Sequence, residues 1–318
     1  MKFDEIVLWS KKIIQDFVTK NPDWIVIIRW ATATGKSKLS VELARFFDIE
    51  IISSDSRQIF RGMNIWTDKV SQEVLDKIPH HQINIVWPEE SYTAWQWQKD
   101  VKRLIKEIQS RWKLPMIVWG TWLYIDTLYK NFEMPEIWPD FEFRKKMFDM
   151  EEKNPGYLHN ELGKIDPEQA KKIHPKSTRY LVRALEIFHS SGKTKTESFL
   201  EKEVEQPILM MWIWREKDET NELINARIKE MIKSGLVEEV KWLLAKWYSP
   251  TLQSMQWIGY KEVIWYLEWK YNIDEMERLL QLNTQRLAKR QRTRFRRYIA
   301  DEKENPKKNV TYKVWYLD

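Results

Sequence analysis

Apolar residues recur along this chain in two patterns, as short unbroken runs and at helical spacing. The runs predict four buried strands, at residues 25–28, 50–54, 116–119 and 208–214. Helical spacing predicts helices at residues 1–21, directly after Ser37, and at residues 93–111. Because strands and helices alternate, the pattern predicts an α/β fold in which helices flank a parallel sheet.

The pattern changes in the middle of the chain, where charged helical segments are broken by prolines. Five prolines interrupt residues 130–206, and we expect this part to be an inserted all-helical domain. The core would then comprise residues 22–129 and 207–318, and its second part is expected to be one strand followed by helices. Residues 1–21 form an N-terminal helical extension to which the sequence assigns no chemistry.

Composition narrows the class of protein. The longest apolar run has seven residues, far fewer than a membrane span needs, and no secretory pattern begins the chain, so we expect a cytoplasmic protein with no membrane partner. The chain has no cysteine, which excludes disulfides, thiolate zinc sites and a cysteine nucleophile. With only 5 histidines, any metal is expected to have oxygen ligands.

Two residue counts are unusual together. At a typical share of about 7%, a chain of this length would contain roughly 22 glycines. It contains 8 glycines and 19 tryptophans, so the glycine deficit and the tryptophan surplus are similar in size. We hypothesise that many tryptophans stand where the fold needs glycine, as if a UGA codon that means glycine in the source had been read as tryptophan.

Basic residues concentrate near the end of the chain. Residues 286–297 contain seven Lys or Arg and no acid, and apolar residues recur among them at near-helical spacing. This segment is expected to be a helix with one buried stripe. Its cationic remainder suits phosphate backbones, although a solvated helix face is an equally ordinary explanation.

A phosphate-binding loop follows the first predicted strand. Residues 30–37, Trp-Ala-Thr-Ala-Thr-Gly-Lys-Ser, fit the pattern G-x-x-x-x-G-K-[ST] except at the first position. In that motif, backbone N–H groups and a helix N-terminus hold phosphate, the Lys neutralises charge, and the hydroxyl holds magnesium. We expect this role for Trp30, Ala31, Thr32, Ala33, Thr34, Gly35, Lys36 and Ser37. A surface helix that begins with this sequence by chance is the alternative.

The acid near this loop does not stand where a hydrolytic P-loop enzyme places it. The strand at residues 116–119 ends in Gly120-Thr121 without an acid, whereas Asp55 follows the strand at residues 50–54. Carboxyl ends of parallel strands line the ligand crevice, so Asp55 and Thr121 are expected to face the loop. Asp55 could then be a general base, or alternatively a helix cap.

A series of motifs resembles the tRNA dimethylallyltransferase family in order and spacing, over about residues 25–298. The motifs are Thr-Ala-Thr-Gly-Lys-Ser at residues 32–37, residues 53–67, Pro79-His-His, residues 119–124, Ile173-His-Pro, Arg183-Ala-Leu-Glu186, residues 235–240 and Ala288-Lys-Arg-Gln291. Two departures, Thr284-Gln-Arg286 and Tyr180, lie where the family more often has Thr-Arg-Gln and a second Arg, so individual tRNA contacts differ there.

The resemblance also bears on the glycine hypothesis. Six tryptophans fall where the family has glycine, and three more are assigned with them: Trp30, Trp66, Trp119, Trp122, Trp257 and Trp269, then Trp95, Trp112 and Trp247. Trp97 is expected to be a genuine tryptophan. The alternative is an inactive paralogue that has accumulated tryptophan.

The resemblance implies transfer of a dimethylallyl group from its diphosphate to N6 of the adenosine that follows the anticodon in tRNA. The P-loop would bind the prenyl diphosphate, with Mg²⁺ on Ser37. Catalytic roles are implied for Asp55, Arg227 and Thr121, with Arg227 adding charge to the leaving diphosphate. The enzyme would be a monomer whose partners are dimethylallyl diphosphate and the tRNA anticodon stem-loop.

The resemblance further implies a tRNA-binding set, in which residues beside Asp55 read the target base and the basic residues grip RNA. The set is Asp55, Ser56, Arg57, Gln58, Thr121, Arg144, Arg179, Arg183, Arg286, Lys289, Arg290 and Arg294. For each of these Arg, a solvated surface position is the alternative. His80 and His81 are expected to be structural, because no matching carboxylate accompanies them in the sequence.

Three other functions remain open. A P-loop kinase would need ATP and a strand-end acid that the sequence lacks. A non-catalytic RNA-binding descendant of the enzyme would require Trp30 and Trp119 to be real. An isopentenyltransferase acting on free adenine nucleotides is a closer alternative, but a mononucleotide would leave the inserted domain and the basic helix with nothing to hold.

Overall fold

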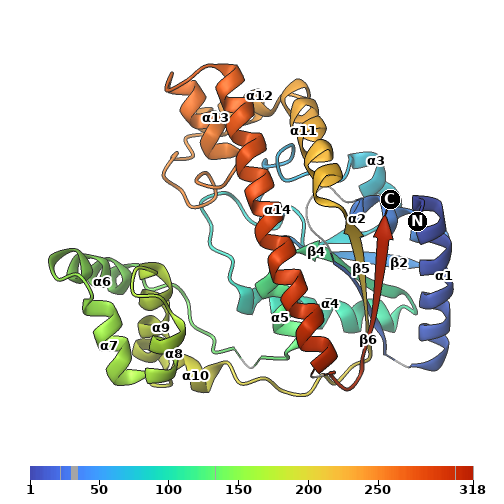
Figure 1. The fold of residues 1–318 in the computed structure, drawn as a ribbon, viewed down its shortest axis with the longest axis horizontal. Coiled ribbons are helices and arrows are strands. Elements are labelled where there is room, and N and C mark those ends of the chain that lie inside the picture. The colour runs from blue at the N-terminus through green and yellow to red at the C-terminus, as the bar shows by residue number, and fades with distance from the viewer. Residues whose placement is uncertain (22, 30–34, 133, 305, 318) are drawn as a thin grey trace. The chain divides into compact units, whose positions relative to one another are not determined.

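The computed structural model describes residues 1–318 apart from 22, 30–34, 133, 305 and 318 (Figure 1). Its sheet has six described strands in the order β3-β2-β4-β1-β5-β6, and every neighbouring pair is parallel. The strands are β1 (Ile25–Arg29), β2 (Ile49–Ser54), β3 (His80–His81), β4 (Leu114–Gly120), β5 (Ile208–Arg215) and β6 (Val310–Leu317). The predicted α/β fold with a parallel sheet is confirmed.

The central strands are buried, which explains their apolar runs. Every residue of β1 and β2 is buried, and so is every residue of β5 except the last one, which is half-buried. Ile27 pairs with Ile117 of β4 on one side and with Met210 of β5 on the other. A parallel strand covered on both faces needs apolar side chains in both directions, so alternation is lost and a continuous run remains.

Strand β6 contradicts the sequence prediction, which made the chain helical after β5. Residues 310–317 instead pair with the whole length of β5 (Figure 1). Only residues 314–317 form an apolar run, and polar residues interrupt the first half of the segment, because β6 lies at the end of the strand order, where Thr311 and Lys313 are exposed. Edge strands carry polar residues on their open side, and that hides their apolar pattern.

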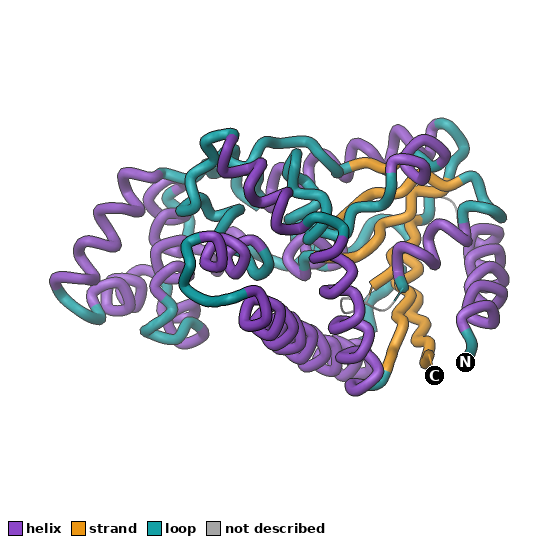
Figure 2. The backbone as a smooth tube through the Cα atoms, turned by 90° about the horizontal axis from the view of Figure 1, so that it is seen from above, coloured by secondary structure: helices purple, strands orange, loops and turns teal. Residues whose placement is uncertain are grey.

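Along the chain, helices precede, separate and follow these strands, and Figure 2 shows them in purple. They are α1 (Phe3–Lys20), α2 (Lys36–Leu43), α3 (Gln72–Lys77), α4 (Ala94–Ser110), α5 (Trp122–Tyr129), α6 (Phe141–Lys153), α7 (Tyr157–Ile165), α8 (Pro167–Lys172), α9 (Thr178–Ser191), α10 (Lys195–Ser198), α11 (Lys217–Lys233), α12 (Leu236–Ala245), α13 (Tyr260–Leu267) and α14 (Ile273–Glu304). In the described residues, no helix combines the length and apolar character that crossing a membrane requires.

Two compact units make up the chain. The core unit comprises residues 1–92, 100–125 and 204–318, and the helical unit comprises residues 93–99 and 126–203. The sequence placed the inserted domain at residues 130–206 and left residues 93–99 in the core. The helical unit has its own apolar cluster, which includes Leu158, Leu162 and Leu181. The core unit contains a cluster from α11 to α14 and the segment after β2, with Met63, Tyr260 and Leu280 fully buried.

Helix α1, to which the sequence assigned no chemistry, packs in the core unit. It buries Ile6, Val7, Ile14 and Phe17 on one face. Lys38 of α2 lies over the Phe3 ring, 4.6 Å from its centroid. The N-terminal amine also donates to the Tyr316 carbonyl oxygen of β6, so the two chain ends lie side by side (Figure 1).

Candidate active site

A glycine opens the helix that follows β1. Gly35 has φ of 89°, in the left-handed region, and α2 begins at the next residue. Glycine has no Cβ and adopts this conformation without strain, which lets the chain turn sharply into the helix. Of the predicted phosphate loop, Gly35, Lys36 and Ser37 lie in the described chain, whereas Trp30, Ala31, Thr32, Ala33 and Thr34 lie outside it.

These residues open onto a cavity of about 800 Å³ within the core unit. Its polar lining includes Gly35, Lys36, Ser37, Asp55, Ser56, Arg57, Gln58, Asp68, Thr121, Arg227, Thr284, Arg290 and Arg294. Its apolar lining includes Trp66, Trp122, Leu223, Ile224, Ile228, Met231 and Leu287. The carboxyl ends of β2 and β4 and the faces of α11 and α14 therefore contribute to one site. Binding crevices of parallel sheets are typically found at such strand ends.

Lys36 is buried at this site. Burial and the nearby Arg227 charge lower the pKa of the Lys36 ammonium to about 7, while Asp68 and Asp55 oppose the shift. A desolvated ammonium beside a second cation is poorly stabilised by the protein alone. The arrangement therefore favours an anionic ligand, which would restore the charged form of Lys36.

Asp55 and Thr121 both line the cavity with the end of the phosphate loop, as expected from the strand ends, and Thr121 contacts Ser56, the neighbour of Asp55. The Thr121 hydroxyl accepts from the Ser56 backbone N–H at 3.0 Å and donates to the Ser56 hydroxyl at 2.7 Å. Asp55 Oδ1 accepts from the Arg57 backbone N–H at 2.9 Å. One Asp55 oxygen thus caps the turn and orients the carboxylate in the lining of the cavity. The capping alternative and the general-base alternative are compatible in this geometry.

Arg57 and Gln58 differ in their surroundings. The Arg57 guanidinium lies over the Trp257 ring at 5.4 Å, and burial lowers its pKa against the opposing charges of Asp55 and Glu262. The Gln58 amide accepts from the Ser53 hydroxyl and donates to the carbonyl oxygens of residues 67 and 68. Gln58 therefore holds the loop after β2 in place, and it also lines the cavity in which the expected base reading would take place.

Arg227 forms an ion pair that the sequence did not reveal. Its Nη2 lies 3.2 Å from Asp68 Oδ2. Asp68 adopts φ of 55°, in the left-handed region, at the end of the loop from β2. The flanking residues Ile224, Ile228 and Met231 are spaced by three or four positions on α11, and they form the apolar wall beside this pair. That spacing was the one available sequence signal for the wall.

The basic residues of α14 separate into two groups. Arg290 and Arg294 line the cavity, and Arg294 lies over the Trp122 ring at 5.3 Å. Arg286 and Lys289 are exposed and are absent from the lining. The sequence expected all four to hold tRNA and gave no sign that two of them line the cavity of Lys36. Arg290 and Arg294 reach that cavity because α14 contributes one of its faces.

In the helical unit, two of the predicted RNA-binding arginines are held by a buried acid. Arg144 donates to both oxygens of Glu186, at 2.7 and 2.8 Å, and Arg183 also pairs with Glu186. Burial alone would raise the pKa of Glu186, but hydrogen bonds from the two arginines hold it below its usual value. Arg179 on α9 is exposed and lies outside this network.

The paired histidines have protein partners, and one of these is a carboxylate, Glu50, that the sequence did not associate with them. His81 Nε2 lies 2.8 Å from the buried Glu50 carboxylate, and His80 Nδ1 lies 2.7 Å from the Ile78 carbonyl oxygen. Glu50 also accepts from Arg111. In the part of the chain that the structure describes, no group of three His, Cys, Asp or Glu could hold a metal by itself.

A sequence profile of the IPP transferase family matches residues 58–298. This match covers most of the core unit and the whole stretch 126–203 of the helical unit. The chain belongs to the IPP transferase family.

Relatives agree with this assignment. The chain is 40% identical over 276 residues to a tRNA dimethylallyltransferase of Dictyoglomus turgidum, covering 86% of this chain and 85% of that protein. It is also 40% identical over 274 residues to the tRNA dimethylallyltransferase of Thermotoga maritima, covering 86% and 90%. These family members are prenyltransferases, and the chain is an enzyme of the same class.

Solved structures share the fold. A full-length tRNA isopentenylpyrophosphate transferase from Bacillus halodurans superimposes with a TM-score of 0.64 at 35% identity, covering 93% of this chain and 92% of that one. A eukaryotic dimethylallyltransferase, solved while acting on tRNA, gives a TM-score of 0.73 at 27% identity over 92% of this chain and 73% of that one.

Proposed function

We propose that the chain transfers a dimethylallyl group from dimethylallyl diphosphate to N6 of the adenosine 3′ of the anticodon in tRNA. One observation carries the proposal: the Asp55 carboxylate lines the same cavity as Lys36, Ser37 and Arg227. An anion-binding wall beside the Asp55 carboxylate suits a reaction that expels diphosphate and removes one proton from an amine. The relatives named for this reaction support the assignment.

Cationic groups stabilise the leaving diphosphate. N6 attacks the allylic carbon, the carbon–oxygen bond breaks, and both bonding electrons leave with diphosphate. Lys36 and Arg227 face this developing negative charge together with the N-terminus of α2, whose backbone N–H groups bind phosphate oxygens. Asp68, the present partner of Arg227, orients the guanidinium before substrate arrives.

Asp55 acts on the amine. Once N6 has bonded to carbon it carries an extra proton, which the Asp55 carboxylate accepts through the oxygen that does not cap the turn. Ser56 and Thr121 fix the backbone beside it. The target base must leave the anticodon stack to reach this cavity, as in other base-modifying enzymes. Arg57, Arg290 and Arg294 are placed in the lining to hold the flipped nucleotide and its phosphates.

Mg²⁺ is the cation that this lining fits. Asp55 is assigned to the proton, and the hard oxygen donors that could hold the cation in this lining are the Ser37 hydroxyl and the Asp68 carboxylate. They are too few to form a complete site, and Mg²⁺ is commonly held by one or two protein oxygens together with substrate phosphates. Such a cation would neutralise diphosphate charge when bound. We also propose a cytoplasmic monomer that holds RNA through Arg179, Arg286 and Lys289.

The assay for this proposal uses dimethylallyl diphosphate, Mg²⁺ and an anticodon stem-loop with adenosine after the anticodon. Two forms of the full chain are compared, one as printed and one with glycine at positions 30, 66, 119 and 122. The glycine form is expected to prenylate the stem-loop at N6 and to leave a guanosine-substituted stem-loop unmodified. Prenylation of free AMP in preference to the stem-loop would favour the nucleotide alternative. Inactivity of both forms on every acceptor would contradict the proposal.

A further inference from the structure

Three tryptophans of this chain have a backbone conformation that tryptophan rarely adopts. Trp112, Trp247 and Trp269 have φ of 60°, 66° and 60°. In the left-handed region the Cβ approaches the following carbonyl oxygen, and bulky residues there are outliers. The other described non-glycine residues with positive φ are all Asp, Asn or Gln: Asp23, Asp68, Gln82, Asn84, Asn131 and Asn309. Asp and Asn tolerate this region because their short polar side chains can bond locally.

All three tryptophans close a helix in the same way. Each backbone N–H donates to the carbonyl three residues back, and the next residue donates to the carbonyl five residues back, which together form a Schellman motif. The bonds run from 112 to 109 and 113 to 108 after α4, from 247 to 244 and 248 to 243 after α12, and from 269 to 266 and 270 to 265 after α13. The left-handed residue of this motif is usually glycine.

The chain itself supplies the comparison. Gly192 follows α9 with φ of 68°. At this helix end the left-handed conformation is therefore adopted by glycine, the residue that is usual there. The three indoles gain no packing that would offset the strain, because Trp112, Trp247 and Trp269 are 94%, 94% and 91% exposed. Trp97 and Trp212 are 0% and 2% exposed and have ordinary backbone.

We infer that residues 112, 247 and 269 are glycine in the native protein, and that the codon read there as tryptophan specifies glycine in the source. Backbone geometry carries this inference independently of family resemblance and of residue counts. It has a consequence for the cavity, since Trp66 and Trp122 both line it. The Trp66 ring lies 2.2 Å from where a Cβ on Gly259 would stand. Glycine at positions 66 and 122 under the same codon rule would enlarge the substrate cavity.

Peptide sequencing by mass spectrometry of the protein purified from its source cells tests the inference directly. Peptides that span positions 112, 247 and 269 are expected to contain glycine. Peptides with Trp97 and Trp212 are the internal controls and should contain tryptophan. Tryptophan at even one of the three helix ends, or glycine at both control positions, would overturn the inference. This measurement does not depend on activity, so it fails or succeeds separately from the proposed function.

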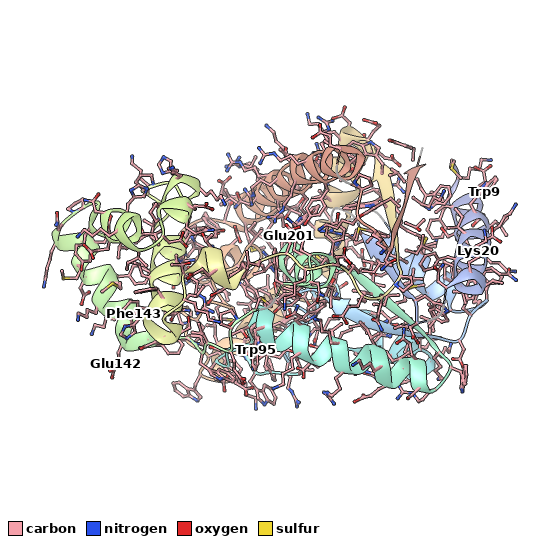
Figure 3. The ribbon with its side chains drawn as sticks, turned by 90° about the horizontal axis from the view of Figure 1, so that it is seen from below. Trp9, Lys20, Trp95, Glu142, Phe143 and Glu201 are labelled. Carbon is pink, nitrogen blue, oxygen red and sulfur yellow. The ribbon has the colours of Figure 1, made fainter. Side chains whose placement is uncertain are left out.

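A recombinant comparison tests the backbone premise. One variant carries glycine at positions 112, 247 and 269, and a second carries alanine there, so both lose the indoles and differ in Cβ alone. The glycine variant should melt higher than the alanine variant, by about 2–4 °C per position. Trp9 is half exposed within α1 (Figure 3), and it provides the opposite case. There the alanine variant should melt higher than the glycine variant, because glycine weakens a helix interior. Equal melting of the two triple variants, or a higher alanine midpoint, would remove the premise.

Discussion

The cations of the cavity and the cations of the helical unit were both expected to meet phosphate, yet their surroundings differ. In the cavity, Lys36 is buried beside Arg227, and the pKa of Lys36 falls to about 7. In the helical unit, Arg144 and Arg183 share the fully buried Glu186, which lies within hydrogen-bonding distance of both. The helical pairing resembles a fold-stabilising network, whereas in the cavity burial and the Arg227 charge outweigh the opposing effect of Asp68 and Asp55 on Lys36.

This difference gives a criterion that distinguishes cations that bind substrate from cations that stabilise the fold. A guanidinium that already donates to both oxygens of a carboxylate gains little free energy by binding phosphate instead. The exchange would leave the carboxylate charged, buried and without its partner, which is costly. A cation held in a dry cavity near another cation gains much from an arriving anion. We therefore expect substrate to change the charges of the cavity and to leave the Glu186 network intact.

The largest expected effect follows from removing the proton acceptor. Asp55→Ala should lower the single-turnover prenylation rate by about 10²–10⁴, the usual loss when a general base is removed. Binding of tRNA should change little, because the carboxylate acts in the transition state. Asp68→Ala is the matched control within the same lining, and it should mainly raise KM for the diphosphate. An unchanged rate for Asp55→Ala at saturating substrates would reduce Asp55 to a turn cap.

The next effect concerns folding of the helical unit. Glu186→Gln removes the charge that Arg144 and Arg183 share and should destabilise the protein by about 1–3 kcal/mol. Breaking a fully buried pair costs about 3–5 kcal/mol, and the arginines here are about one third exposed, so water offsets part of the loss. Thermal unfolding measures the change. Glu161→Gln, which breaks the exposed Lys164 pair, is the control and should have almost no effect.

The same network also has a pH dependence. Because the pKa of Glu186 lies below its usual value in the folded protein, its contribution to stability is present above the unfolded pKa of about 4.3. It should be lost as the pH falls through the folded value. Glu186→Gln should therefore flatten the acid side of the stability curve, and an unchanged acid limb would show that other carboxyls control it.

The sequence revealed the sheet because buried parallel strands leave continuous apolar runs, as at β1 and β5. It missed β6, since an edge strand keeps polar residues among its apolar ones. Asp55 and Thr121 could be placed together because both end parallel strands. The pairs of Arg227 with Asp68 and of Arg144 with Glu186 could not, because each joins segments whose contact arises only in the tertiary fold.

A third prediction concerns Lys36 and pH. Its pKa is about 7 in the free enzyme, and a bound diphosphate should raise it, so binding takes up a proton between the two values. Affinity for dimethylallyl diphosphate should therefore fall as pH rises from about 7.5 to 9, by up to about tenfold per pH unit. Calorimetry in buffers of different ionisation enthalpy should detect the uptake.

Substitution controls make this test specific. Lys36→Arg should retain binding and lose the proton uptake, because arginine remains charged throughout this range. Lys77→Arg, at an exposed side chain outside the cavity lining, should behave like the parent. Identical pH dependence in all three proteins would assign the effect to another group and remove the distinction between the cavity cations and the others.

The smallest effect distinguishes the two groups on α14. Neutralising the exposed pair Arg286 and Lys289 to Gln should weaken tRNA binding and reduce the slope of log affinity against log salt by about 0.7–0.9 for each phosphate that is no longer bound. KM for dimethylallyl diphosphate should not change, because neither residue lines the cavity. Neutralising Arg290 and Arg294 should reduce the salt slope similarly and should also raise the KM for dimethylallyl diphosphate, because both residues line the same cavity as Lys36. Salt titrations of stem-loop binding beside steady-state kinetics separate the outcomes. If both pairs of substitutions change KM to the same extent, the positive charges of α14 act together and the two groups are not distinct. If neither pair changes the salt slope, α14 is a solvated face and the RNA-binding surface must lie in the helical unit.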